Sequence, residues 1–141
     1  MHKIRVVAAL SVAFLFSASS ACAEIVRVYV HNIEKTGEIN LAVYDSANRF
    51  KNGDGVVVGA IKDVSAGDTT FEFDLPIGRY AIKVFVDANY NKELDLNFLG
   101  IPKEQVGFSN DATGNFGPPS FSDASFSVPD NKDLQINLIS H

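Results

Sequence analysis

The sequence predicts an all-β protein: a single antiparallel β-sandwich of about seven strands, immunoglobulin-like or transthyretin-like. Short stretches rich in β-branched and aromatic residues alternate between apolar and polar positions, as half-buried strands do. Turn residues separate these stretches, and no segment shows convincing helical periodicity. The order of strands with short connections fits a sandwich better than a closed barrel.

The expected strands follow one another from residue 25 to residue 139, each with its own alternation. They are residues 25–30, 39–44, 56–61, 69–75, 79–86, 124–128 and 134–139. Lys35-Thr36-Gly37 suits a hairpin between the first two, and Asn52-Gly53-Asp54-Gly55 suits the turn before the third. In Leu75-Pro76-Ile77-Gly78, proline and glycine favour a tight turn, after which Leu75 and Tyr80 are expected to close one end of the core.

The N-terminal residues 1–23 have the pattern of a secretory signal peptide, which leaves residues 24–141 as the domain. Lys3 and Arg5 precede an apolar run over residues 6–16, and Ala21-Cys22-Ala23 suits signal peptidase. The run is too short to span a bilayer, so no transmembrane segment is expected in the mature chain. The expected location is periplasmic or secreted. The alternative of a lipid anchor at Cys22 lacks the usual leucine, because Ser19 stands three residues before the cysteine.

Composition excludes several classes of function. Removing the signal leaves 10 Lys and Arg residues against 17 Asp and Glu, a formal charge of about −7, which disfavours nucleic acid as a partner. Cleavage after Ala23 leaves no cysteine, and His31 and His141 are then the only histidines, too few for a zinc site. Another exported protein or a small ligand remains as the expected partner.

The segment from residue 87 to residue 123 has little strand pattern and is unusually long for a loop. Its apolar content predicts an ordered flap packed onto the sandwich rather than a disordered one. Among these apolar residues are three phenylalanines spaced between glycines and prolines: Phe108, Phe116 and Phe121. Exposed, they would form a ligand-binding platform or cleft; buried, they would form a lid over the end of the sandwich.

The flap begins with DANYNKELD, which predicts a Ca²⁺-type cation loop. Asp87, Asn89, Asn91 and Asp95 stand at relative positions 1, 3, 5 and 9, and the backbone carbonyl of Glu93 stands at position 7. Calcium takes six to eight such oxygen ligands. The helix-loop-helix pattern is incomplete, since Lys92 replaces its glycine and Phe98 its bidentate glutamate. The expected dissociation constant is therefore weak, roughly 10⁻⁴–10⁻³ M. The alternative is a loop of hydrogen-bonded turns without metal.

Several ordered motifs resemble one family, the bacterial domain-of-unknown-function family 2141, small exported proteins of Gram-negative bacteria. The motifs are Ala42-Val43-Tyr44-Asp45, the turn at residues 75–81, the D-x-N-x-N loop, G-I-P-x-E at 100–104, G-F-S-N at 107–110 and F-G-P-P-x-F at 116–121. The resemblance implies an exported β-sandwich with no assigned activity. Members commonly carry glycine where this chain has Lys92.

The function expected from these observations is an exported binding or accessory module in which a weak cation loop braces the flap. One alternative is a structural or protein-interaction domain without metal. The other is a hydrolase that uses flap carboxylates such as Glu104 and Asp111. Any acidic chain offers such a pair of carboxylates, so the pair is weak evidence for catalysis and an enzyme is not expected.

Overall fold

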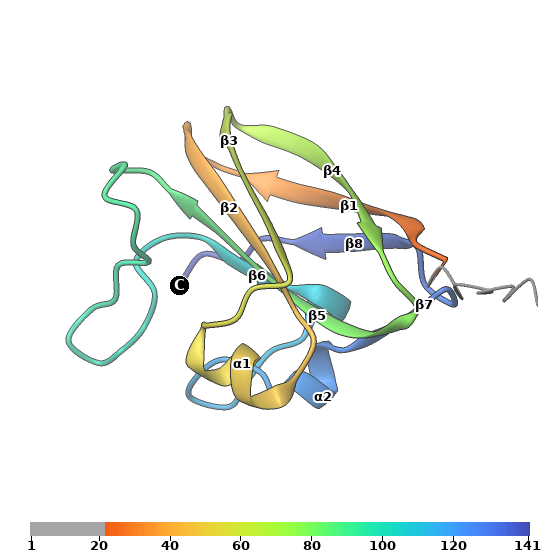
Figure 1. Cartoon of the computed structure of the whole chain (residues 1–141). Helices are drawn as coiled ribbons and strands as arrows, with labels where there is room; N and C mark the ends of the chain where they lie inside the picture. The colour runs from red at the N-terminus through yellow and green to blue at the C-terminus, as the bar shows by residue number, and fades with distance from the viewer. Residues whose placement is uncertain (1–21) are drawn as a thin grey trace, which may run out of the picture.

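The computed structural model describes residues 22–141, and these form two β-sheets packed face to face (Figure 1). The prediction of an all-β sandwich is confirmed, with eight strands instead of seven. Residues 1–21, which hold nearly all of the predicted signal peptide, lie outside the described part of the chain. Within residues 22–141, no helix is long and apolar enough to cross a membrane.

One sheet has three strands in the order β4-β1-β8. Strand β1 (Glu24–Ile33) pairs antiparallel with β4 (Gly67–Leu75) and parallel with β8 (Asp133–Asn137). The other sheet has the order β3-β2-β5-β6, formed by β2 (Gly37–Tyr44), β3 (Val58–Val64), β5 (Gly78–Asp87) and β6 (Val106–Phe108). Strand β7 (Phe126–Val128) pairs with the first residues of β5.

The main core lies between the two sheets, where alternate residues of the long strands are buried. Among the fully buried side chains are Val26, Val28, Val30, Ile39, Val43, Ile82 and Ile136. Leu75 and Tyr80 are buried at one end as predicted, and the Tyr80 hydroxyl donates a 2.8 Å hydrogen bond to the Pro76 carbonyl. This bond fixes the turn that carries the chain from one sheet to the other.

The predicted hairpin at Lys35-Thr36-Gly37 is wrong, because β1 and β2 belong to different sheets and do not pair. The turn instead crosses the edge of the sandwich, so that both strands bury their apolar residues against the same core. Alternation along a strand reports which face is buried and does not identify the neighbouring strand.

The expectation of no helix is also wrong. Helix α1 (Ala47–Asn52) begins after Ser46, whose hydroxyl accepts from the Arg49 N–H at 3.4 Å, and ends at Gly53 with φ of 72°. Helix α2 (Phe121–Ala124) and a 3₁₀ turn (Ser109–Asp111) lie in the predicted flap. Consequently Ala124 ends a helix and does not begin a strand, and β3 begins two residues later than predicted. These helices are too short to show a period of 3.6 residues.

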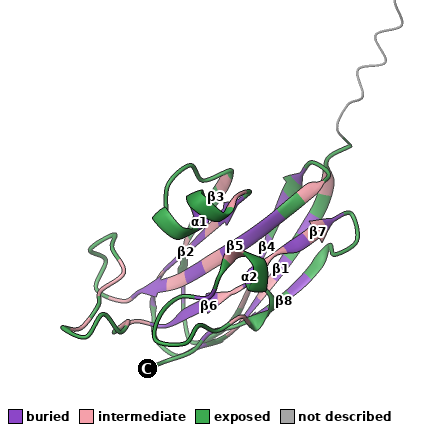
Figure 2. Ribbon diagram, turned by 90° about the horizontal axis from the view of Figure 1, so that it is seen from below, coloured by how far each residue is buried: buried purple, intermediate pink, exposed green. Residues whose placement is uncertain are grey.

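The two helices cover one end of the outer face of the β3-β2-β5-β6 sheet (Figures 1 and 2). There they enclose a second, smaller core formed by Tyr44, Phe50, Ala81 and Ala124. Phe50 of α1 is 2% exposed, and the rings of Phe108 and Phe121 contact it edge-on at centroid distances of 6.2 and 6.0 Å. No other helix of residues 22–141 covers that face.

The predicted flap packs onto the sandwich only in part. Its first half projects beyond the sheet as a narrow loop (Figure 1), closed by the Lys103 N–H bonding the Asp95 carbonyl at 2.8 Å. At its tip Phe98 is 95% exposed and Leu99 is 68% exposed, and Phe116 in the second half is fully exposed. The prediction of a packed flap is wrong for these residues. Phe98 and Leu99 stand at the end of a two-stranded loop that leaves the sheet and so has no layer beneath it.

Candidate functional site

The predicted cation loop begins at a buried carboxylate. Asp87 is the last residue of β5 and is fully buried. Its two carboxylate oxygens accept hydrogen bonds from the backbone N–H groups of Asn91 at 3.2 Å and Lys92 at 2.7 Å. The loop therefore turns back over the end of β5 and wraps around the Asp87 side chain.

Asp95 holds the other side of this loop. One of its oxygens accepts from the Asn91 amide nitrogen at 2.7 Å, and the other accepts from the Asn89 amide nitrogen at 2.5 Å. The amide oxygens of Asn89 and Asn91 accept from the N–H groups of Asn91 and Glu93 respectively. The structure thus brings together Asp87, Asn89, Asn91 and Asp95. Glu93 joins this network through its N–H, and no bond involves the carbonyl that was predicted as a ligand.

Glu104 belongs to the same site and was not predicted as part of it. Its carboxylate accepts from the N–H groups of Ala88 and Asp95, each at 3.2 Å, and so ties the two sides of the loop together. Burial raises the pKa of Glu104, and the negative charges of Asp95 and Asp87 raise it further, against the effect of the two backbone bonds. Sequence spacing gave no signal, because Glu104 reaches the loop only after the excursion through the exposed tip.

Lys92 occupies the position where a calcium loop favours glycine, and it adopts that backbone conformation with φ of 67°. Its ammonium is turned toward β2, where it pairs with the Glu38 carboxylate at 2.5 Å. Within residues 22–141, no group of three or more His, Cys, Asp or Glu residues could hold a metal ion. A cation at this loop would therefore depend on amide and backbone oxygens for most of its ligands.

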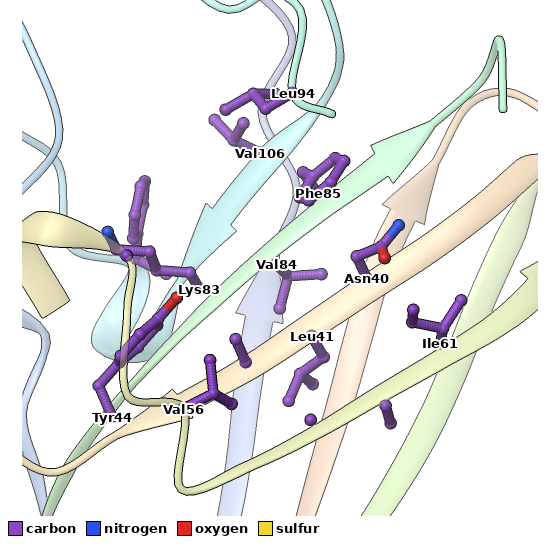
Figure 3. A pocket seen from close by; sticks show the side chains of 15 residues that line it. Asn40, Leu41, Tyr44, Val56, Ile61, Lys83, Val84, Phe85, Leu94 and Val106 are labelled. Atoms are coloured by element: carbon purple, nitrogen blue, oxygen red, sulfur yellow. The ribbon is translucent and has the colours of Figure 1, made fainter. Parts of the chain in front are cut away.

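A second site, a groove of about 680 Å³, lies on the outer face of the β3-β2-β5-β6 sheet (Figure 3). Its floor is formed by outward-facing residues of β2, β3 and β5, which lie side by side across the sheet. Asn40 of β2 pairs with Ile61 and Phe85, and Ala42 pairs with Gly59 and Lys83. Val56, after α1, and Leu94, in the projecting loop, also line it. The helical end and the loop thus form opposite walls.

This groove has the size and the largely apolar lining of a small-molecule site. Ile61 is 61% exposed and Val56 is 45% exposed, so apolar surface faces solvent there. The polar side chains are few: Lys83, Asn40 and the Tyr44 hydroxyl. Sequence reasoning missed the groove because these residues alternate with the core residues of the same strands. The one available signal was that Ile61, Phe85 and Ala42 are apolar on the face expected to be polar.

The three aromatic residues predicted as a ligand platform do not form one. Phe108 lines the groove and packs on Phe50, Phe121 packs on another side of Phe50, and Phe116 stands fully exposed. Glu104 and Asp111 also have separate partners. Asp111 accepts from the backbone N–H and side-chain amide of Asn137, each at 2.8 Å, on β8.

Fold and site together define a class: a small β-sandwich with an apolar groove on one outer face and an oxygen-rich loop beside it. The chain belongs to the bacterial family DUF2141, described as an uncharacterized protein conserved in bacteria, whose model matches residues 28–137. The match spans both sheets, the groove and the loop. No curated protein and no solved structure matches the chain significantly.

Proposed function

We propose that this protein is an exported binding module that holds an apolar small molecule against the outer face of the β3-β2-β5-β6 sheet. The groove between the helical end and the projecting loop is the observation that carries the proposal. An outer sheet face in a sandwich is usually polar, whereas this one carries the exposed Ile61 and the partly exposed Phe85, and the exposed Val56 lines the groove beside the sheet. Export is supported by the signal-like pattern of residues 1–23.

We propose that the loop from Asp87 to Asp95 holds a weakly bound Ca²⁺-type cation. The cation would stabilise the projecting loop, which forms the wall of the groove opposite the helices. Two observations support this: the four predicted side chains converge, and Leu94, next to Asp95 in the chain, lines the groove. Rotation of the Asn89 and Asn91 amides would present oxygens to a cation where nitrogens now face Asp95. That rotation gives up hydrogen bonds to backbone N–H groups, which fits weak affinity.

A binding role is favoured over hydrolysis because the flap carboxylates are engaged in backbone bonds. Glu104 closes the loop and Asp111 holds β8, so neither is free to act on a substrate in this arrangement. A structural domain without ligand or metal is the second candidate. The two backbone hydrogen bonds that the Asp87 carboxylate already accepts are the observation that supports this second candidate.

Binding of the neutral dye Nile red tests the proposal, because its fluorescence rises in an apolar site. Ala42→Phe, which fills the floor of the groove, should abolish the rise while the melting temperature stays close to wild type. Ile25→Phe is the matched control, since Ile25 is 49% exposed on the opposite sheet. Loss of binding in Phe98→Ser, with Ala42→Phe unaffected, would place the apolar site at the loop tip and overturn the proposal.

A further inference from the structure

Lys83 places a partly buried positive charge at the helical end of the groove (Figure 3). Its ammonium donates to the backbone carbonyl of Phe50, in the last turn of α1. The nitrogen also lies 4.5 Å from the centre of the Phe50 ring and 5.3 Å from that of Tyr44. These contacts hold the ammonium in a fixed place beside the groove.

The ammonium has no ion pair with any described carboxylate, although the structure contains five salt bridges elsewhere. Burial lowers the pKa of Lys83, and no acidic neighbour offsets that effect. An ammonium has three donors, and the Phe50 carbonyl takes one of them. A partly desolvated charge without a counter-ion is unfavourable, and an anion in the groove would relieve that cost.

The remainder of the groove is largely apolar, with Asn40 and the Tyr44 hydroxyl as its other polar groups. It extends diagonally from Lys83 across β2 toward Ile61 on β3. Two strand spacings across and two residues along give this path a length of about 12 Å. Beyond it, the paired positions Glu38 and Asp63 carry acidic side chains, and Lys92 neutralises only Glu38. The groove therefore has a cation at one end, apolar surface in the middle and acidic groups beyond the other end.

We propose that the groove takes an elongated apolar molecule ending in a single anionic group, such as a fatty acid, with its carboxylate at Lys83. This assignment rests on the proposed binding function and adds the ligand class and its orientation. The alkyl chain crosses β2 between Ala42 and Asn40 toward Ile61. The carboxylate accepts from the free N–H donors of Lys83, which stays bound to the Phe50 carbonyl.

Displacement of Nile red by decanoate, decanol and decylamine tests the ligand class. In the wild type, decanoate should bind roughly tenfold more tightly than decanol, as a charge-assisted hydrogen bond in a partly desolvated site predicts, and decylamine should bind most weakly. Lys83→Met should remove the preference for decanoate while decanol binding stays unchanged. Lys83→Arg keeps the charge and should retain the preference for decanoate. Unchanged decanol binding by Lys83→Met shows that this variant is folded.

Lys62→Met is the matched control. Lys62 also donates to a backbone carbonyl, that of Thr70, and its nitrogen lies 4.2 Å from the centre of the Phe71 ring. Its strand partner is the core residue Ile39, so it faces away from the groove. Equal wild-type affinity for decanoate and decanol, or a preference that survives in Lys83→Met, would overturn the anion assignment and leave the binding function standing. Failure of all three ligands to displace the bound dye would overturn the elongated ligand class, whereas dye binding that Ala42→Phe leaves intact is the result that contradicts the proposed function itself.

Discussion

The hydroxyl of Ser109 accepts a 2.9 Å hydrogen bond from the backbone N–H of Ile82, in the middle of β5. The same hydroxyl donates to the carbonyl of Ala124 at the end of α2. Ser109 is fully buried, so these bonds replace solvent for two backbone groups. They join β5, an internal strand of the grooved sheet, to the helical wall.

Ser109→Ala should lower the free energy of unfolding by about 2 kcal/mol, because it leaves the Ile82 N–H and the Ala124 carbonyl buried without partners. Urea denaturation measures the change. Ser65→Ala, in the exposed turn between β3 and β4, is the control and should stay within about 0.5 kcal/mol of wild type. Equal stability of the two variants would show that water replaces the hydroxyl.

The residues around Ser109 have packing roles that the sequence pattern does not predict. The motif G-F-S-N was recognised only as a family feature, and no periodicity revealed that each residue has a packing role. A side chain at Gly107 would meet Ile136 at 2.7 Å, and the Asn110 amide donates to the carbonyls of Asp123 and Ser125. These partners come from other strands and loops, so local pattern cannot identify them.

The strands and the interior were predictable for the opposite reason. Burial of alternate residues leaves a direct trace in the sequence, and the Leu75–Tyr80 turn carries its own proline and glycine signals. The convergence of Asp87 with Asn89, Asn91 and Asp95 was likewise predictable, because it arises within nine residues. The groove and Glu104 depend on long-range placement, which alternation does not encode.

Tyr80→Phe should destabilise the protein by about 1 kcal/mol, because the Pro76 carbonyl loses its hydrogen bond while the ring remains packed. Chemical denaturation gives the difference. Tyr29→Phe on β1 is the comparison, since Tyr29 is only partly buried and should tolerate loss of its hydroxyl. A larger loss for Tyr29→Phe would contradict the role assigned to the turn.

Calcium should raise the melting temperature if the Asp87–Asp95 loop holds a cation. At about 10 mM Ca²⁺, a dissociation constant of roughly 10⁻⁴–10⁻³ M stabilises the fold by about 1.4–2.7 kcal/mol, a shift of several degrees. Asp95→Ala should abolish the shift measured between Ca²⁺ and EDTA. Asp133→Ala, an exposed acidic position on β8, should retain it. No shift in the wild type would reduce the loop to hydrogen-bonded turns.

Glu104 predicts a specific pH dependence of stability. Its pKa is raised above the ordinary value of 4.5, chiefly by burial, so the folded state keeps a proton that the unfolded chain releases. The free energy of unfolding should therefore fall as the pH rises from 4.5 through the raised pKa of the folded state. Glu104→Gln should remove this part of the decline, and Glu93→Gln, at an exposed position of the same loop, should not. If the free energy of unfolding varies with pH in the same way in the wild type and in Glu104→Gln, the pKa of Glu104 is not raised in the folded state.

Binding of an apolar ligand to the outer face of the β3-β2-β5-β6 sheet is measured most directly by the change in backbone amide chemical shifts of the ¹⁵N-labelled protein on titration with decanol. The largest shifts are expected at residues 40–44, 59–61 and 83–85, the strand segments that form the groove. Shifts confined to β1 and β4 of the opposite sheet, or to the exposed loop tip around Phe98, would contradict binding at this face.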